Sequence, residues 1–194
     1  MPRFVAASTR LVAGSYRGRI LQVPPGSDVR PTAGRTREAM FNILAHPRWS
    51  TEALVPGACV LDAFCGSGAL GLEALSRGAS TCLFLDVSQP VLECVRANIA
   101  ALGEEKRATL LRADATKPPP ARISATLAFL DPPYRQDRAV PALAALTARG
   151  WFAPGATVIV ETDSRDQFTP PPLYVIVDQR RYGHTALYVM AYTP

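Results

Sequence analysis

Short apolar runs alternate with helical segments over the middle of the chain, and this alternation restricts the possible folds more than any other feature. The apolar runs are 59–63, 82–86, 109–111, 127–130 and 157–161. Apolar residues recur at helical spacing within 70–75, 87–102 and 139–149, which lie between those runs. Strands that alternate with helices form a parallel sheet with right-handed crossovers. The sequence therefore predicts an α/β fold.

Both ends of the chain break this alternation. Residues 173–177 and 186–190 have the composition of strands, and the connection 180–184 is too short to hold a helix. We expect these two strands to pair as an antiparallel hairpin. Near the start, the apolar stretches 11–13 and 20–23 flank a glycine-containing turn and predict a second β-hairpin.

The expected organisation has two parts. Residues 1–30 form a basic β-hairpin extension, and residues 31–194 form one α/β domain whose mostly parallel, seven-stranded sheet ends in the antiparallel hairpin. An amphipathic helix at 31–46 opens the larger part. With 194 residues, of which 48% are hydrophobic and 19% charged, the chain is long enough to bury a core without disulfides or metal.

Composition argues against several classes of protein. No apolar run approaches the ~20 residues that a membrane-spanning helix needs. The first residues do not read as a secretion signal, so we expect a cytoplasmic protein. The four cysteines form no Cys-x-x-Cys pair and there are only two histidines, which argues against a metal site. We also expect a monomer.

The positive charge is concentrated at the N-terminus. Residues 1–50 hold eight arginines against two acidic residues, a net charge of +6, while the whole chain carries +5. Arginine pairs with phosphates through a planar fork and stacks on bases. The pattern fits a polyanionic partner such as a nucleic acid, although an arginine-rich solvated surface would have the same composition.

A glycine-containing motif joins the first strand of the large domain to the helix that follows it. Residues 62–71 read DAFCGSGALG. Glycines let a backbone bend sharply and approach a ligand, and the helix N-terminus adds unpaired N–H groups. An opening carboxylate suits a cation better than a phosphate, so a ligand with an ammonium group, such as S-adenosylmethionine, fits. A tight turn without a ligand remains the alternative. The candidate cofactor contacts are Asp62, Phe64, Gly66, Ser67 and Gly68.

Two further carboxylates follow neighbouring strands. Asp86 ends the second strand, 24 residues after Asp62, and is a candidate acceptor for the ribose hydroxyls of an adenosine-containing cofactor. The alternative role for Asp86 is to cap the next helix. Asp114, with Ala115 beside it, follows the third strand and is a candidate contact for the adenine ring. Turn-forming aspartates are common, so Asp114 alone is an ambiguous signal.

The tetrapeptide Asp131-Pro132-Pro133-Tyr134 follows the fourth strand and is the sharpest signal in the chain. Two successive prolines fix the backbone and remove two N–H donors. The Asp131 carboxylate and the Pro132 carbonyl then form a clamp that accepts both hydrogens of an amine, and Tyr134 stacks on the base that carries it. Base stacking on an aromatic ring is worth ~1–3 kcal/mol. These four residues are the predicted catalytic group.

Several motifs together resemble the RsmD family of bacterial methyltransferases, which act on guanine N2 in small-subunit (16S) ribosomal RNA. They are 14–19 (GSYRGR), 30–32 (RPT), 35–42 (RTREAMFN), 62–71 and 131–134. The resemblance covers nearly the whole chain. The tetrapeptide is shared with other amino methyltransferases, whereas the arginine-rich block at 30–42 is more specific to the family. Gly34 and Met40 stand where the family is expected to have Asp and Leu.

The resemblance implies a fold, a cofactor and a partner. The fold is the Rossmann-like fold of class I methyltransferases, and the cofactor is S-adenosylmethionine. The reaction is direct methyl transfer to an exocyclic base amine. The partner is ribosomal RNA or the small ribosomal subunit. The arginines expected to hold RNA phosphates are Arg17, Arg19, Arg30, Arg35 and Arg37.

Three other functions remain as alternatives. DNA or RNA adenine-N6 methyltransferases and DNA cytosine-N4 methyltransferases also use the tetrapeptide, but the DNA enzymes usually carry a larger target-recognition region. A non-catalytic ribosome-assembly factor would bind RNA without the cofactor, yet the residues of the cofactor motif are all present. A small-molecule methyltransferase would have no use for the arginine-rich N-terminus.

Overall fold

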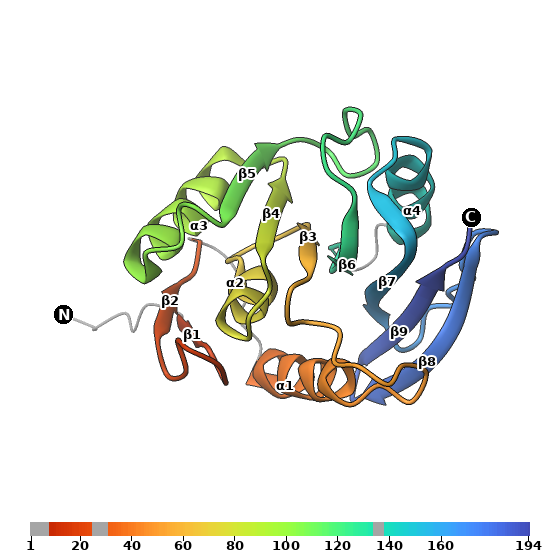
Figure 1. Cartoon of the computed structure of the whole chain (residues 1–194), viewed down its shortest axis with the longest axis horizontal. Coiled ribbons are helices and arrows are strands. Elements are labelled where there is room, and N and C mark those ends of the chain that lie inside the picture. Colours follow the sequence, from red (N-terminus) through yellow and green to blue (C-terminus); the bar gives the residue numbers. More distant parts are fainter. Residues whose placement is uncertain (1–7, 25–30, 134–137) are drawn as a thin grey trace.

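The computed structural model describes residues 8–24, 31–133 and 138–194. A seven-stranded sheet forms the centre of the molecule, and a separate two-stranded hairpin lies beside it (Figure 1). The strands are β1 (Ser8–Arg10), β2 (Ile20–Gln22), β3 (Cys59–Ala63), β4 (Thr81–Asp86), β5 (Ala108–Arg112), β6 (Ala125–Leu130), β7 (Phe152–Asp163), β8 (Tyr174–Tyr182) and β9 (Thr185–Tyr192). The helices are α1 (Pro31–Ala45), α2 (Ala69–Ser76), α3 (Gln89–Leu102) and α4 (Ala139–Ala148).

The sheet has the predicted topology. Its strand order is β5-β4-β3-β6-β7-β9-β8. The first five of these strands run parallel to one another, and β9 pairs antiparallel with both β7 and β8. The expectation of a mostly parallel sheet that ends in an antiparallel hairpin is therefore confirmed.

Helices cover both faces of the sheet. One buried cluster joins α1, α2, α3 and the N-terminal hairpin to one face, where Phe41 packs on Phe129 with ring centroids 5.5 Å apart. The second cluster joins α4 to the other face and includes Trp151 and Phe152. Because consecutive strand residues point to opposite faces, a parallel strand buried on both sides is almost continuously apolar. This explains the uninterrupted run at Leu127–Leu130.

The N-terminal hairpin forms, but its first strand is not where the apolar stretch predicted it. β1 covers Ser8–Arg10, and the segment 11–13 is not a strand. The backbone N–H groups of Val12 and Ala13 instead donate to the Glu73 carboxylate on α2, at 2.8 and 3.0 Å. The apolar character of this segment reflects burial rather than strand pairing, since Leu11 is buried in the core.

The C-terminal hairpin is longer and tighter than expected. β8 and β9 pair up to Tyr182 and Thr185, which leaves only Gly183 and His184 as the turn. Gly183 has a φ of +60°, the left-handed conformation that two-residue hairpin turns require. The predicted connection at 180–184 therefore belongs mostly to the strand.

Gly34 lies inside α1, where the family is expected to have an acidic residue. A Cβ atom at this position would meet no atom within 4 Å. Glycine weakens a helix interior because the unfolded chain loses more conformational freedom at that position. Gly34→Ala is therefore expected to raise the free energy of unfolding by about 0.5–1 kcal/mol. Urea denaturation checks this, and a lower midpoint in the variant would show that α1 does not tolerate the side chain.

Candidate active site

The register of the parallel strands brings the predicted motifs together at one edge of the sheet. Ala63, the last residue of β3, pairs with Leu85 of β4 on one side and with Leu130 of β6 on the other. The glycine loop, which is the motif at 62–71, therefore lies beside Asp86 and Asp131, because all three are at the carboxyl ends of adjacent strands. This carboxyl edge is where ligands bind in open α/β sheets.

The three glycines of the loop have different roles. A Cβ on Gly66, which has a φ of +52°, would meet nothing within 4 Å, so the backbone faces open space there. A Cβ on Gly68 would lie 3.0 Å from Val95, and one on Gly71 would lie 2.4 Å from Phe84. Gly66 thus leaves room for a ligand, while Gly68 and Gly71 let α2 pack closely on its neighbours. This open backbone fits the predicted cofactor contact.

Asp62 braces the glycine loop from inside. Its side chain is buried, and Oδ2 accepts a hydrogen bond of 2.8 Å from the N–H of Gly71. Burial, with a smaller contribution from the negative charge of Asp86, raises the pKa of Asp62 to about 8 against the opposing effect of that hydrogen bond. The expected contact with an ammonium group stays a prediction, and the contact in the structure holds the loop in place.

The raised pKa of Asp62 predicts a pH dependence of stability. Between the unfolded value of 3.8 and the folded value of about 8, the folded state keeps the proton that the unfolded chain releases. The contribution of Asp62 to the free energy of unfolding therefore falls as pH rises through this window. Asp62→Asn removes the titration, so between pH 5 and 8 it should gain more than about 1 kcal/mol relative to the parent protein. Urea denaturation across that range tests this, and parallel pH profiles would contradict it.

Asp86 and Asp114 lie where loops leave the carboxyl edge. Asp86 Oδ1 accepts from the N–H of Ser88 at 2.9 Å, and Oδ2 is 3.4 Å from the N–H of Gly66. Asp114 accepts from Thr116 and from Nη2 of Arg138, at 2.6 and 2.7 Å for its two oxygens. Burial alone would raise the pKa of Asp114, but these hydrogen bonds outweigh it and lower the pKa. Asp86 therefore links the cofactor loop to the start of α3, and Asp114 stays ionised.

Arg138 connects three of the loops at this edge. It pairs with Asp114, and its guanidinium lies 5.6 Å from the ring centroid of Phe64. Phe64 has a φ of +61°, an uncommon backbone conformation for a residue other than glycine. The loops after β3, β5 and β6 are thus held against one another. Ala115, the neighbour of Asp114, is buried, and its expected contact with the cofactor stays a prediction.

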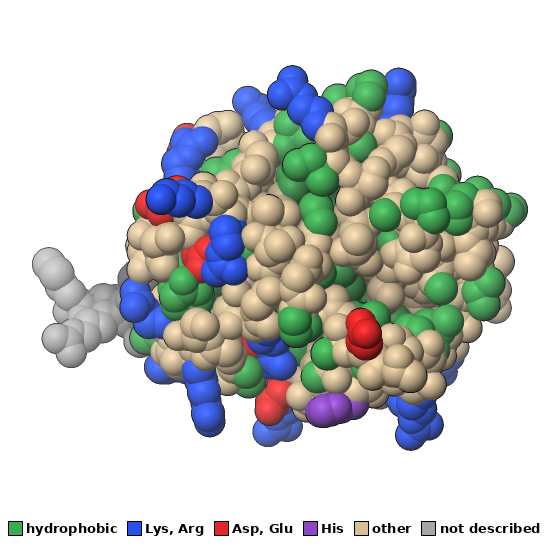
Figure 2. Space-filling view, viewed as in Figure 1, with side chains coloured by type: hydrophobic (Ala, Val, Ile, Leu, Met, Phe, Trp, Pro, Cys, Tyr) green, Lys and Arg blue, Asp and Glu red, His purple; other side chains and the backbone are tan. Residues whose placement is uncertain are grey.

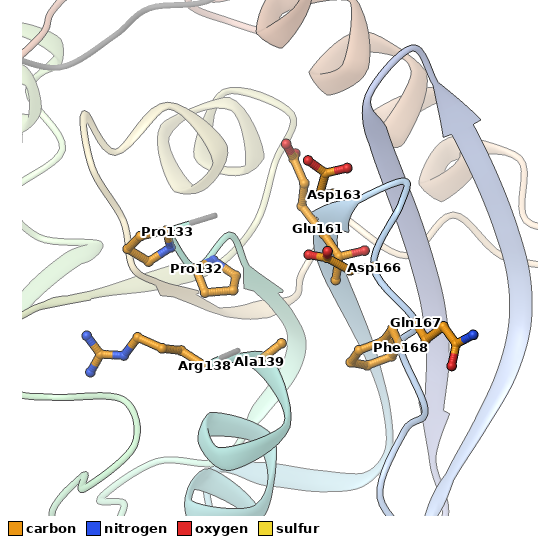
Figure 3. A pocket seen from close by; sticks show the side chains of 10 residues that line it. Pro132, Pro133, Arg138, Ala139, Glu161, Asp163, Asp166, Gln167 and Phe168 are labelled. Carbon is orange, nitrogen blue, oxygen red and sulfur yellow. The ribbon is translucent and has the colours of Figure 1, made fainter. Parts of the chain in front are cut away.

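A cleft of about 390 Å³, counted with its open mouth, lies beside the proline clamp. Figure 3 shows Pro132 and Pro133 on one wall and carboxylates from the end of β7 on the opposite wall. Its lining residues are Pro132, Pro133, Arg138, Ala139, Glu161, Thr162, Asp163, Asp166, Gln167 and Phe168. Phe168 stacks against Tyr188 with ring centroids 4.6 Å apart.

Part of this cleft was not predicted from the sequence. The β7 carboxylates are Glu161 and Asp163, with Asp166 just beyond the strand. Glu161 ends the predicted strand 157–161, so its position at the ligand edge was a usable signal. Phe168 follows no motif, and only the folded chain places it at the cleft. Tyr134, the predicted stacking residue, lies outside the described residues.

The predicted RNA-binding arginines do not share one environment. Arg17, Arg19 and Arg35 are exposed. Arg37 does not share this exposure, because its side chain is only 6% exposed, and its expected phosphate contact stays a prediction. Its guanidinium donates to Thr9 Oγ1 at 3.1 Å and to the Arg10 carbonyl at 2.6 Å, so it holds the hairpin rather than facing solvent. Arg30 lies outside the described residues.

Comparison with known proteins identifies the family of the chain. A family model described as "Conserved hypothetical protein 95" matches residues 9–191. "Ribosomal RNA small subunit methyltransferase D" of Haemophilus influenzae is 32% identical, over 90% of this chain and 89% of that protein. The protein of that name from Escherichia coli K12 is 35% identical, over 79% of this chain and 74% of its own length. The chain belongs to the RsmD family.

Solved structures agree with this membership. A candidate methyltransferase from Escherichia coli, yhhF, superposes with a TM-score of 0.80 at 30% identity, over 96% of this chain and 99% of that one. A candidate methylase from Haemophilus influenzae gives a TM-score of 0.78 at 26% identity, over 97% and 100% of the two chains. Like its family, the chain is an S-adenosylmethionine-dependent methyltransferase with a Rossmann-like fold.

None of the described helices is long and apolar enough to cross a bilayer. The described histidine, cysteine and acidic side chains form no group of three that could hold a metal ion.

Proposed function

We propose that the protein transfers a methyl group from S-adenosylmethionine to the exocyclic N2 amine of a guanine in small-subunit (16S) ribosomal RNA. The observation that carries this proposal is the adjacency of β3 and β6, which sets the clamp at Asp131 and Pro132 beside the glycine loop. The relatives from Haemophilus influenzae and Escherichia coli are named as ribosomal RNA small subunit methyltransferases. We further propose that the protein acts in the cytoplasm and as a monomer.

The far wall of the cleft supports guanine as the target. Guanine presents its N1–H and its N2 amine on one edge, so that edge offers only donors beside the carbonyl at C6. Adenine and cytosine each present a ring nitrogen acceptor next to their amine. Carboxylates accept hydrogen bonds and do not donate when ionised. An amine held at Pro132, with the neighbouring N1–H directed at Glu161 or Asp166, suits guanine and disfavours the other two bases.

The residues of the chain align the reaction rather than forming a bond with the substrate. The lone pair of an exocyclic guanine amine is delocalised into the ring, which makes the nitrogen a poor nucleophile. We expect Asp131 and the Pro132 carbonyl to accept the amine hydrogens and turn the lone pair toward the methyl donor. Bound S-adenosylmethionine supplies an electrophilic methyl group. Alignment of this kind can contribute ~7–11 kcal/mol.

No cysteine near the site is suited to act as a nucleophile. Cys65 lies in the glycine loop, but burial raises the pKa of its thiol, and the charges of Asp62 and Asp86 raise it further. The thiolate, which is the reactive form, is therefore not populated. This supports direct transfer from the cofactor to the base nitrogen, which must leave its stack or already be unpaired.

Exposed basic side chains supply the expected contact with RNA. Figure 2 shows Lys and Arg side chains on the side of the molecule where the hairpin and α3 lie, and others along the top and lower edges of the view. Arg17 and Arg19 are exposed on the hairpin, where Arg19 also donates to the Ala101 carbonyl of α3, and Arg35 lies exposed on α1. We assign these three to phosphate contacts, which position an RNA without reading its sequence. Arg30 keeps its place in the proposal as an untested contact.

Methyl transfer to ribosomal particles tests the proposed function. Small subunits and total RNA from a strain lacking the protein are incubated with the protein and radiolabelled S-adenosylmethionine, and the product nucleoside is identified. We expect N2-methylguanosine in small-subunit RNA. Label in adenine, or in DNA alone, would show a different amino methyltransferase. Binding of RNA without cofactor binding or label would favour an assembly factor.

A further inference from the structure

A single buried amide connects the N-terminal hairpin to the cofactor loop. Asn98 lies on α3 and is 2% exposed. Its Oδ1 accepts from the N–H of Gln22 at 2.8 Å, and its Nδ2 donates to the Gln22 carbonyl at 2.9 Å. The same Nδ2 donates to the carbonyl of Ser67 at 3.1 Å. Both amide atoms are therefore in use, and they join two segments 45 residues apart in sequence.

The partners of Asn98 belong to the two binding regions. Gln22 is the last residue of β2, and Asn98 pairs with both its backbone groups as a neighbouring strand would. Ser67 lies between Gly66 and Gly68 in the loop predicted to hold the cofactor. Fixing the Ser67 carbonyl sets the orientation of the peptide bond that leads into α2. Asn98 therefore gives β2 a direct connection to the cofactor loop, whereas the contacts of the hairpin with Glu73 and Ser76 reach α2 beyond that loop.

Other contacts tie the hairpin to the same helix. Arg19 Nη2 donates to the Ala101 carbonyl in the last turn of α3, at 2.7 Å. Tyr16 donates its hydroxyl proton to Glu104, just beyond the helix. The cofactor loop packs on the middle of the same helix, where Val95 lies against Gly68. α3 is thus shared by the hairpin that carries the exposed arginines and by the loop at the active edge (Figure 1).

We propose that Asn98 is a positioning residue that couples RNA bound to the hairpin to the cofactor loop. RNA that fixes β2 also fixes the Ser67 carbonyl through Asn98. The cofactor loop is then already partly ordered, so the cofactor loses less free energy in ordering it. Each ligand then binds more tightly in the presence of the other, and the effect is reciprocal. This inference rests on the proposed RNA-binding function of the hairpin.

Asn98→Ala breaks the connection without changing either binding surface. It leaves the N–H and carbonyl of Gln22 and the carbonyl of Ser67 without this partner, which also lowers stability. Val158→Ala is the matched control, because it removes buried volume from β7, in the core cluster on the face of the sheet opposite α3. Both variants are used at a temperature where they remain folded by circular dichroism.

The measurement is RNA affinity with and without saturating S-adenosylhomocysteine, the unreactive product of the cofactor. Filter binding at one fixed salt concentration uses a labelled small-subunit ribosomal RNA transcript. We expect the parent protein and Val158→Ala to bind RNA about fivefold or more tightly when the nucleoside is present. In Asn98→Ala the ratio of the two affinities should fall to about one, while RNA binding alone persists.

Each of the other possible outcomes of this experiment contradicts a specific part of the proposal. A parent protein that binds RNA with equal affinity in both conditions overturns the coupling and leaves the proposed function intact. An Asn98→Ala variant that keeps the full ratio, or a control that loses it, overturns the role of Asn98. A parent protein with no affinity for the RNA overturns the RNA-binding function of the hairpin, and the coupling with it.

Discussion

Asp131→Asn is expected to lower the rate of methyl transfer by at least about a thousandfold, equivalent to about 4 kcal/mol of transition-state stabilisation, with cofactor affinity unchanged. Asparagine keeps the size of the side chain but replaces one acceptor oxygen with an NH2 donor. The amide has no charge to strengthen its hydrogen bond to the target amine, and when its NH2 group faces the amine hydrogens the clamp repels the group that it has to orient. The Pro132 carbonyl alone cannot fix both hydrogens.

The experiment separates alignment from binding. Single-turnover rates with saturating small subunits report the chemical step, and calorimetry with S-adenosylhomocysteine reports the cofactor site. Asp178→Asn on β8 is the control, because this aspartate pairs with Arg180 at 3.0 Å and lies on the edge strand of the sheet, away from the cleft. Normal turnover by Asp131→Asn would remove the carboxylate from the mechanism.

The site residues that could be predicted from the sequence lie at the carboxyl ends of strands. Asp62, Asp86 and Asp131 each follow or end an apolar run, and parallel strands deliver their carboxyl ends to one edge. The alternation of strands and helices is therefore enough to predict that residues far apart in the sequence lie side by side at this edge, and no individual contact has to be known. The roles of individual glycines were less accessible, because the close packing of Gly68 on Val95 and of Gly71 on Phe84 is visible only in the folded chain.

The parts that sequence reasoning missed depend on contacts between distant segments. Nothing local distinguishes Arg37 from Arg35, which is two residues earlier in the same helix, yet one is buried and the other exposed. The difference arises because α1 presents Arg37 to the hairpin and to Glu73 of α2. Likewise, the apolar stretch 11–13 resembles a strand, and only the Glu73 carboxylate explains why it is not one.

Glu73 is the residue on which the seating of the hairpin depends. Its side chain is fully buried and accepts from Val12, from Ala13 and from Nε of Arg77 at 2.8 Å, while Nε of Arg37 lies 3.9 Å away. Burial lowers the pKa of Arg37, and the charge of Glu73 acts in the opposite direction. Removing this carboxylate leaves two backbone donors and Nε of Arg77 without their acceptor, and it leaves the buried charge of Arg37 without its counter-charge.

Glu73→Ala is therefore expected to lower the free energy of unfolding by about 3–5 kcal/mol, as for other buried ion pairs that lose one partner. Glu93→Ala on the exposed face of α3 should change it by no more than about 0.5 kcal/mol. A double-mutant cycle with Arg37→Met sharpens the test, because the second substitution removes the stranded charge. The double variant should then lose less stability than the two single losses combined. Strict additivity in urea denaturation would show that Glu73 and Arg37 act independently, and the hairpin would have to be held by other contacts.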